Sequence, residues 1–320
     1  MNNSLIIIIL GIVFTSAFLI AYIRKKANNG VDKNDLREPM KSQISQATVN
    51  EIIAIHEEYR KSVHIPVDDL RFWGHFINNW AIPEYQRQNE PRIIHSSGYG
   101  VYDFSDAFNK GFLKMSSEVR NIHSKDLEEH SGDFFNWLMN LSLVRAYNAL
   151  EILILQSTNA CFLNLGIKIL ASKRDMNKIH SEIGKKLNLK SDRVNNKHLI
   201  QFLCENSDDF KKWVKDKVRY DGLITREDFF YLISVLRHCV VHQAAILSKD
   251  SLNEINSKSS KDFFSQFFTL VDAGNNCYEF KPIQEKFIYF LDLSIEFAVN
   301  TLTFVAKQPN FRFLKMSNVY

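Results

Sequence analysis

An arginine and two histidines lie close together within an apolar stretch of this chain. The stretch runs from Phe229 to Leu247 and reads FFYLISVLRHCVVHQAAIL, a pattern that predicts a helix burying most of its circumference. Arg237, His238 and His242 interrupt it. Burying an unpaired polar group costs about 2–7 kcal/mol, so we expect these side chains to be paired or used. Arginine binds phosphate oxygens and histidine exchanges a proton near neutral pH, so the residue types indicate phosphate chemistry.

The spacing of the three residues predicts a shared site. His238 and His242 are four residues apart and share a helix face, while Arg237 is adjacent to His238. We therefore expect all three to line one cleft. The spacing alone is not specific, because Arg193 and His198 have the same separation in a polar segment; the hydrophobic surroundings distinguish Arg237. A metal site at the two histidines needs a third ligand, which no residue at a suggestive spacing supplies, so we expect no metal and no cofactor.

A second apolar segment is expected to position this site. Residues 132–163 predict a central core helix, because apolar positions cover nearly its whole surface. Arg145, Asn148 and Glu151 interrupt it at intervals of three residues and share roughly one face. We expect this polar stripe to meet the helix that carries Arg237.

These two segments resemble the HEPN superfamily of α-helical proteins, many of which are ribonucleases of toxin–antitoxin and antiphage systems. The family motif is arginine, a polar residue, three further residues and histidine, which Arg237, His238 and His242 match; Glu151 matches an earlier acidic position. The likeness covers about residues 130–250. It implies a metal-independent ribonuclease in which His242 transfers protons and Arg237 stabilises the phosphorane, with His238 and Glu151 in support.

The resemblance also implies partners. HEPN enzymes usually form homodimers in which two motifs face each other, and their substrate is RNA. A bacterial defence or toxin-like effector is the role implied by the family, and a regulatory protein partner is a further expectation. Two alternatives stay open, a non-catalytic HEPN-fold membrane adaptor and a sensor, both acting through protein–protein interaction.

Basic residues are concentrated in one part of the chain. Residues 173–197 hold eight Lys or Arg against three acids, although the whole chain has a formal net charge of only +4. We expect this run to contribute to RNA affinity but not to the chemistry, or else to be a solvated face. The RNA-binding candidates are Lys185, Lys186, Lys190 and Arg193.

The N-terminal sequence predicts a membrane anchor. Residues 5–23 carry no charge and are long enough to span a hydrocarbon layer of roughly 30 Å. Arg24, Lys25 and Lys26 follow, which predicts a single-pass protein of the cell inner membrane with a cytoplasmic C-terminal part. The four cysteines are widely spaced and form no CxxC pair, as expected of reduced thiols in that compartment.

The expected organisation is an all-α protein, a single transmembrane helix followed by a HEPN-like multi-helix cytoplasmic domain. Helical patterns begin near residue 48 and recur at 68–80, 105–119 and 282–306, whereas 91–103 is irregular or a short hairpin. The expected regions are an anchor with its basic flank at 1–26, a tether at 27–47, an N-terminal helical region at 48–130 and a HEPN-like helical domain at 131–320.

Overall fold

The computed structural model describes most of the chain from residue 46 onward. The described residues are 46–89, 93–103, 114–167, 170, 172–189, 194–218, 223–258 and 261–305. They belong to one compact unit, Ser45–Tyr320. The expected anchor at 5–23 and all but the end of the tether lie outside the described residues. Helices dominate the described part, which confirms a mostly helical protein, but two small antiparallel sheets accompany them.

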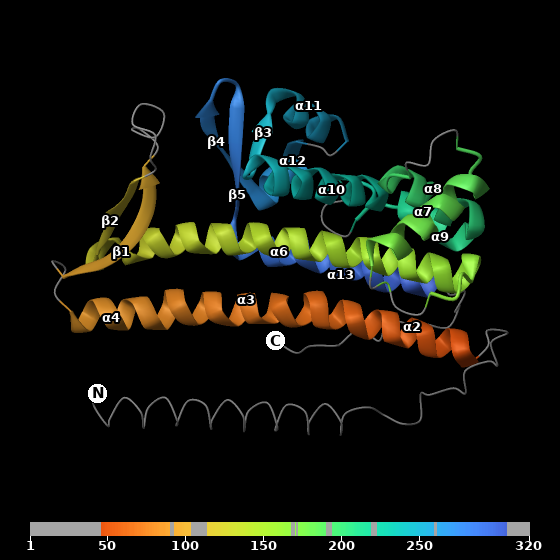
Figure 1. Ribbon diagram of the computed structural model, residues 1–320, viewed down its shortest axis with the longest axis horizontal. Coiled ribbons are helices and arrows are strands. Elements are labelled where there is room, and N and C mark those ends of the chain that lie inside the picture. The colour runs from red at the N-terminus through yellow and green to blue at the C-terminus, as the bar shows by residue number, and fades with distance from the viewer. Residues whose placement is uncertain are drawn as a thin grey trace. The chain divides into compact units, whose positions relative to one another are not determined.

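The described part of the chain begins with a continuous helical run that lies alongside helix α6 (Leu127–Thr158; Figure 1). The run consists of α2 (Gln46–Tyr59), α3 (Ile65–Phe76) and α4 (Ile82–Gln88), joined by the π-helical turns η2 (Arg60–His64) and η3 (Ile77–Ala81). A proline stands at the start of α3 and again at the start of α4. Proline removes a helical N–H, and the wider π turns before it let the helix continue. The helical run therefore continues past both prolines.

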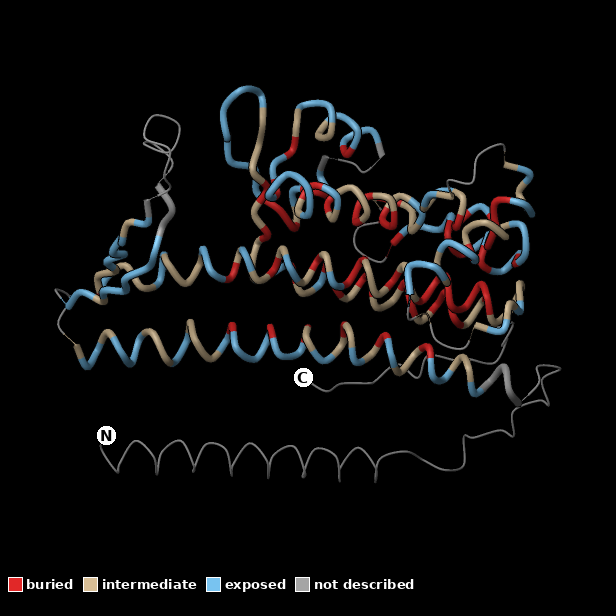
Figure 2. Tube along the Cα trace, in the orientation of Figure 1, coloured by how far each residue is buried: buried red, intermediate tan, exposed pale blue. Residues whose placement is uncertain are grey.

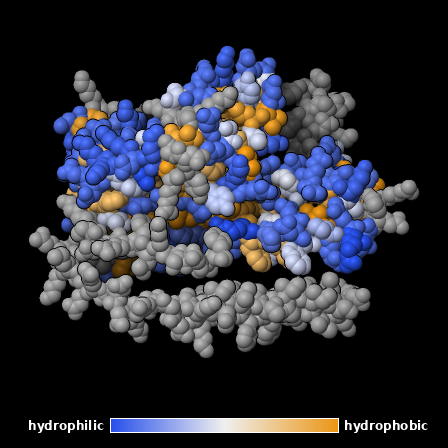
Figure 3. All heavy atoms as spheres, turned by 180° about the vertical axis from the view of Figure 1, so that it is seen from behind, coloured by the Kyte–Doolittle hydropathy of each residue, from blue (hydrophilic) through white to orange (hydrophobic). Residues whose placement is uncertain are grey.

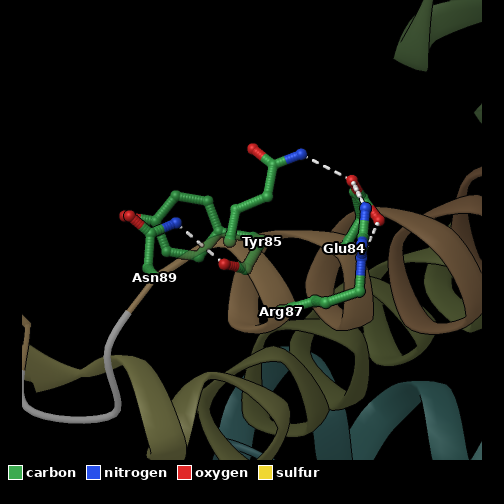
Figure 4. A network of polar contacts seen from close by, with 5 residues as sticks. Glu84, Tyr85, Arg87 and Asn89 are labelled. Atoms are coloured by element: carbon green, nitrogen blue, oxygen red, sulfur yellow. Dashed lines mark hydrogen bonds and ion pairs between the residues drawn. The ribbon is translucent and has the colours of Figure 1, made fainter.

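The run ends in a small network of polar contacts (Figure 4). Arg87 donates from Nε and Nη2 to the carboxylate of Glu84, which also accepts from Gln88. Asn89 leaves the helix in an extended conformation, and its Nδ2 donates to the carbonyl of Tyr85 at 2.8 Å. The same carbonyl also accepts from the backbone N–H of Asn89 at 3.1 Å, so two donors of one residue end the helix there.

A long β-hairpin follows. Strand β1 (Ile94–Asp103) pairs antiparallel with β2 (Lys114–His123). Residues 94–103, expected to be irregular or a short hairpin, instead form one continuous strand of a longer hairpin, and the helix expected over 105–119 is wrong for the described residues 114–119. Cross-strand bonds explain the difference, because Ser96 donates to Asn121 at 2.6 Å and the Tyr99 hydroxyl donates to Glu118 at 2.9 Å. Pairing with a distant segment outweighs local periodicity here.

Two long helices form the centre of the core. Helix α6 (Leu127–Thr158), preceded by the 3₁₀ turn η4 (Ser124–Asp126) and extended by the π-helical η5 (Asn159–Leu163), packs against α13 (Gln284–Val305). Both were expected from the sequence. Figure 2 shows buried residues concentrated on the facing sides of these helices and of α10. The boundary expected between residues 130 and 131 falls inside α6.

Both core helices also have the composition of membrane spans. Within the described residues, Ser124–Leu163 and Gln284–Val305 are long and apolar enough to cross a bilayer, yet 44% and 56% of their most apolar windows are buried inside the protein. Core helices pass the same test, so composition does not separate the two roles. Figure 3 shows mostly hydrophilic side chains, with hydrophobic groups between them, on the face opposite to that in Figure 1.

Four shorter helices follow; the first three lie near one end of α6, and the fourth lies along its middle (Figure 1). They are α7 (Lys173–Lys186), α8 (Asn196–Asn206), α9 (Asp208–Lys215) and α10 (Arg226–Gln243). Each begins with a side-chain cap: Ser172, Asn195, Ser207 and Thr225 accept a hydrogen bond from a backbone N–H of the first turn.

A three-stranded antiparallel sheet of order β3-β5-β4 lies beyond α10. Its strands are β3 (Ile246–Ser248), β4 (Phe268–Gly274) and β5 (Cys277–Pro282), with α11 (Lys249–Lys258) and α12 (Lys261–Phe267) between β3 and β4. Asn275 and Asn276 join β4 to β5 with φ of 54° and 60°. Two such residues in succession are typical of a type I′ hairpin turn. The sequence analysis did not anticipate this sheet.

Candidate functional site

Helix α10 presents one face to the core and leaves its last turn at the surface. Its buried positions recur at helical spacing and are Phe229, Phe230, Leu232, Ile233, Leu236 and Cys239. The last turn differs, because His238, Val241 and His242 are exposed. The expectation that α10 buries most of its circumference is therefore wrong for this turn, and its two imidazoles incur no burial cost.

Arg237 points in a different direction, toward α6. It is partly buried, and its Nε donates to Oδ1 of Asn148 at 3.2 Å. Its guanidinium carbon lies 5.9 Å from the ring centroid of Tyr147, close enough for a cation–π interaction. Neighbouring residues of α6 therefore fix the side chain from two directions. In the described part of the chain, the hydrogen bond of this guanidinium comes from Nε. Its other two nitrogens, Nη1 and Nη2, are left to donate to another acceptor.

A partly buried hydrogen-bond network lies beside Arg237. Asn196, the first residue of α8, donates from Nδ2 to the hydroxyl of Ser234 at 2.6 Å, and Ser234 stands one turn before Arg237 on α10. Asn196 and Ser234 also hydrogen-bond to Tyr147, and these bonds lower the pKa of its phenol. Burial has the larger effect and raises that pKa well above its ordinary value. Tyr147 therefore stays neutral and joins α6, α8 and α10 beneath the guanidinium.

Glu151 lies one turn from Tyr147 and Asn148 on α6. Burial raises the pKa of its carboxyl above the ordinary value, and the positive charge of Arg237 acts in the opposite direction. The carboxylate and the guanidinium thus interact electrostatically, as the sequence predicted for the polar stripe of α6. The third residue of that stripe departs from the expectation, because Arg145 donates from Nε to the carbonyl of Ser62 on η2 at 2.7 Å.

The two histidines form a pair at the surface. The ring centroids of His238 and His242 are 4.7 Å apart, with the ring planes inclined by 48°. A shared helix face was expected and is confirmed, but the single cleft holding all three residues is wrong. The reason is angular: Arg237 precedes His238 by about 100° around the helix, so it reaches α6 while the imidazoles face outward.

The backbone directly after His242 is strained. Ala244 and Ala245 have φ of 51° and 65°, in the left-handed region, where the other described non-glycine residues with positive φ are all asparagines. A left-handed alanine costs roughly 1–2 kcal/mol. The N–H of Ala245 bonds to the carbonyl of Cys239 at 3.2 Å, which ends the helix and turns the chain into β3. Such strain is often stored beside functional groups.

The basic candidates lie only partly within the described residues. Lys185 and Lys186 are exposed in the last turn of α7, and Lys185 forms an ion pair of 2.6 Å with Glu182. Lys190 and Arg193 lie outside the described residues. Helix α7 packs against α8, whose Asn196 belongs to the network beside Arg237.

Sequence reasoning missed three members of this site. Ser234 precedes Arg237 by one helical turn, a spacing that already placed the two residues on one face. Tyr147 is aromatic and reads as core in a sequence, and nothing in the sequence marks Asn196.

Among the described residues, no group of three or more His, Cys, Asp or Glu side chains is placed to hold a metal ion. Searches of family models, curated proteins and solved structures find no match to this chain.

Proposed function

We propose that this chain is a membrane-anchored, metal-independent endoribonuclease of HEPN type. One observation carries the proposal: a guanidinium fixed by Asn148 and Tyr147 lies on the same helix as two exposed, paired imidazoles. In the described part of the chain, Nη1 and Nη2 of Arg237 have no hydrogen-bond partner and are left to bind a phosphate, and His242 lies at the surface where an RNA strand has access. Together they supply the residue types that RNA cleavage needs.

The proposed reaction uses the ribose 2′-hydroxyl as nucleophile. An imidazole removes the 2′-hydroxyl proton while the oxygen bonds to phosphorus, and a second imidazole, protonated, donates a proton to the departing 5′-oxygen. The products are a 2′,3′-cyclic phosphate and a 5′-hydroxyl, so the proton count balances. Arg237 stabilises the negative charge that builds on the phosphoryl oxygens. Because the nucleophile belongs to ribose, DNA is not a substrate.

The proposed active form is a homodimer in which the motifs of two copies face each other, as the HEPN resemblance implies. His242 of each copy can supply one of the two imidazoles, with His238 tuning its neighbour from 4.7 Å away. The exposed last turn of α10 includes Val241, which is 45% exposed. In the proposed dimer this turn lies at the interface with the second copy.

The proposed location is the inner membrane, with the described domain in the cytoplasm. The uncharged segment at 5–23 and the basic residues that follow support this part of the proposal. Full-length protein should remain in the membrane pellet after alkaline carbonate washing. Uncleaved protein in the supernatant would contradict the membrane anchor, but it would not bear on the proposed ribonuclease activity.

Two substitutions test the proposed chemistry. We expect His242→Ala to lower cleavage of RNA by about 10²–10⁴-fold, because it removes a proton-transfer group. Arg237→Ala should do the same by removing the phosphate-binding charge, and Arg237→Lys should recover only part of the rate, since lysine lacks the planar fork. His75→Ala, which removes an exposed imidazole of α3, is the matched control and should leave the rate unchanged.

A non-catalytic adaptor is the second candidate, and the bond from Arg237 to Asn148 favours it. A guanidinium that only joins α6 to α10 would be structural. In that case Arg237→Ala would leave Asn148 without its partner, lower stability by about 1–3 kcal/mol and affect no activity. Thermal unfolding measured on the same variants separates the readings, because the exposed His242 should have little effect on stability in either case.

A further inference from the structure

Tryptophans are unusually exposed at one end of this fold. The chain has four, and Trp73, Trp80 and Trp137 are 50%, 66% and 59% exposed, whereas Trp213 is buried. Neighbouring residues extend the same surface, which we call the aromatic patch. It consists of Phe72, Trp73, Trp80, Phe134, Trp137 and Leu141, all at least 43% exposed. Large aromatic side chains are mostly buried in folded proteins, so a group of this size needs an explanation.

The patch extends over two neighbouring helical segments. Gly74 of α3 faces the ring of Phe135 on α6, whose Cε1 lies 3.8 Å from where a β-carbon on the glycine would be. Trp73 and Phe134 are the chain neighbours of these two residues. Four residues further along, Ser131 of α6 donates to Asn78 of η3 at 3.1 Å. The exposed rings of the two segments therefore flank a single helix–helix contact.

The rings also contact one another within each segment. Phe72 and Trp73 have ring centroids 5.3 Å apart, and on α6 those of Phe134 and Trp137 are 6.1 Å apart. These contacts hold the rings at the surface. They do not bury them, and no described element of this chain covers them.

We propose that the aromatic patch lies in the headgroup region of the lipid bilayer that holds residues 5–23. Tryptophan is enriched at the boundary between lipid and water, because its ring is amphipathic. The proposal rests on the anchor assigned under the proposed function, but not on the ribonuclease chemistry.

The chain that precedes the described residues is long enough for this placement. Trp80 lies roughly 50 Å along the helical run from Gln46, at 1.5 Å per residue. The segment 24–45 spans up to about 70 Å when extended, so the run has the reach to lie along the membrane surface while residues 5–23 cross it.

Charges around the patch predict which lipids it prefers. Asp69, Glu128, Glu129 and Asp133 are exposed nearby, and Asp68 is paired with Arg71. These acidic residues disfavour an anionic surface, unlike the polybasic segments that bind acidic lipids. We therefore expect contact with zwitterionic lipids, driven by the aromatic side chains and insensitive to salt.

The test uses tryptophan fluorescence of the full chain reconstituted in phosphatidylcholine vesicles. Lipids brominated near the top of the acyl chains should quench more than half of the emission, since three of the four tryptophans lie in the patch. The Trp80→Phe and Trp137→Phe variants should each lose part of the quenched emission. The Trp73→Phe, Trp80→Phe, Trp137→Phe triple variant retains only Trp213 and should not be quenched. Adding phosphatidylglycerol should not increase the quenching.

Three results would overturn this inference. Protein that floats with the vesicles but shows no quenching would place the patch in water or against protein. The tryptophans could instead be shielded from iodide, show no quenching by lipid, and lose that shielding when the protein is diluted. This result would show that a second copy covers the patch. Protein that does not float with the vesicles at all would show that the chain is not held in a bilayer, so lipid would not be what covers the patch. RNA cleavage in the same samples reports independently on the proposed activity.

Discussion

At the residue scale, the site depends on one arginine held between two helices. Arg237 is fixed by Asn148 and Tyr147, and Glu151 lies close enough to act on it electrostatically. The sequence predicted Arg237, Glu151 and Asn148 as neighbours because their spacings placed them on facing helix surfaces. It did not predict Asn196, since a contact between residues 38 positions apart has no local signal.

Glu151→Gln should stabilise the protein at neutral pH. Burial raises the pKa of Glu151 in the folded state, so the folded protein binds a proton more readily than the unfolded chain, and its stability falls as pH rises through that interval. The neutral glutamine avoids the cost of burying a charge. The melting temperature of the variant should exceed that of the natural protein at pH 7.

The same comparison at lower pH supplies the control. The difference in melting temperature should shrink as pH falls and vanish below the ordinary carboxyl pKa, where Glu151 is protonated in both states. A variant that is less stable than the natural protein at pH 7 would show instead that attraction to Arg237 outweighs burial. RNA cleavage by the variant should fall, because Arg237 loses a partner that orients it.

At the element scale, long helices were predictable and short strands were not. Helices α6, α10 and α13 each hold many apolar residues at helical spacing, and capping by Thr225 marks where α10 begins. The strands of both sheets are stabilised by partners elsewhere in the chain, so their sequences carry a weak local pattern. The π-helical turns before Pro66 and Pro83 also went unpredicted, because a proline usually indicates a break.

Ala244→Gly should stabilise the end of α10. Ala244 is exposed and has a left-handed backbone, which glycine adopts without steric cost. We expect a gain of about 0.5–1 kcal/mol, or roughly 1–3 °C in melting temperature for a domain of this size. Gln243→Gly is the matched control, since residue 243 is exposed but still helical, and glycine there should destabilise. A loss of stability in Ala244→Gly would show that the methyl group makes a contact worth more than the strain.

At the scale of the whole molecule, the proposed dimer brings two copies of α10 together. Val241→Arg should produce a monomer by light scattering and lower RNA cleavage in parallel, because like charges then meet across the interface. The fold should tolerate the change, since Val241 is exposed. Val119→Arg, on the exposed β2 strand, is the matched control and should stay dimeric. A natural protein that is monomeric at tens of micromolar and still active would contradict the shared site.

The most direct test of the central claim follows the fate of the scissile phosphate. Full-length protein in detergent or vesicles is incubated at pH 6–8, where histidine changes charge, with an RNA and with the same RNA carrying a 2′-deoxyribose at the cleaved position. We predict cleavage of the first substrate to a 2′,3′-cyclic phosphate and a 5′-hydroxyl, retained in EDTA and lost in His242→Ala, and no cleavage at the deoxyribose. Equal cleavage of both substrates, or undiminished cleavage by His242→Ala, would contradict it.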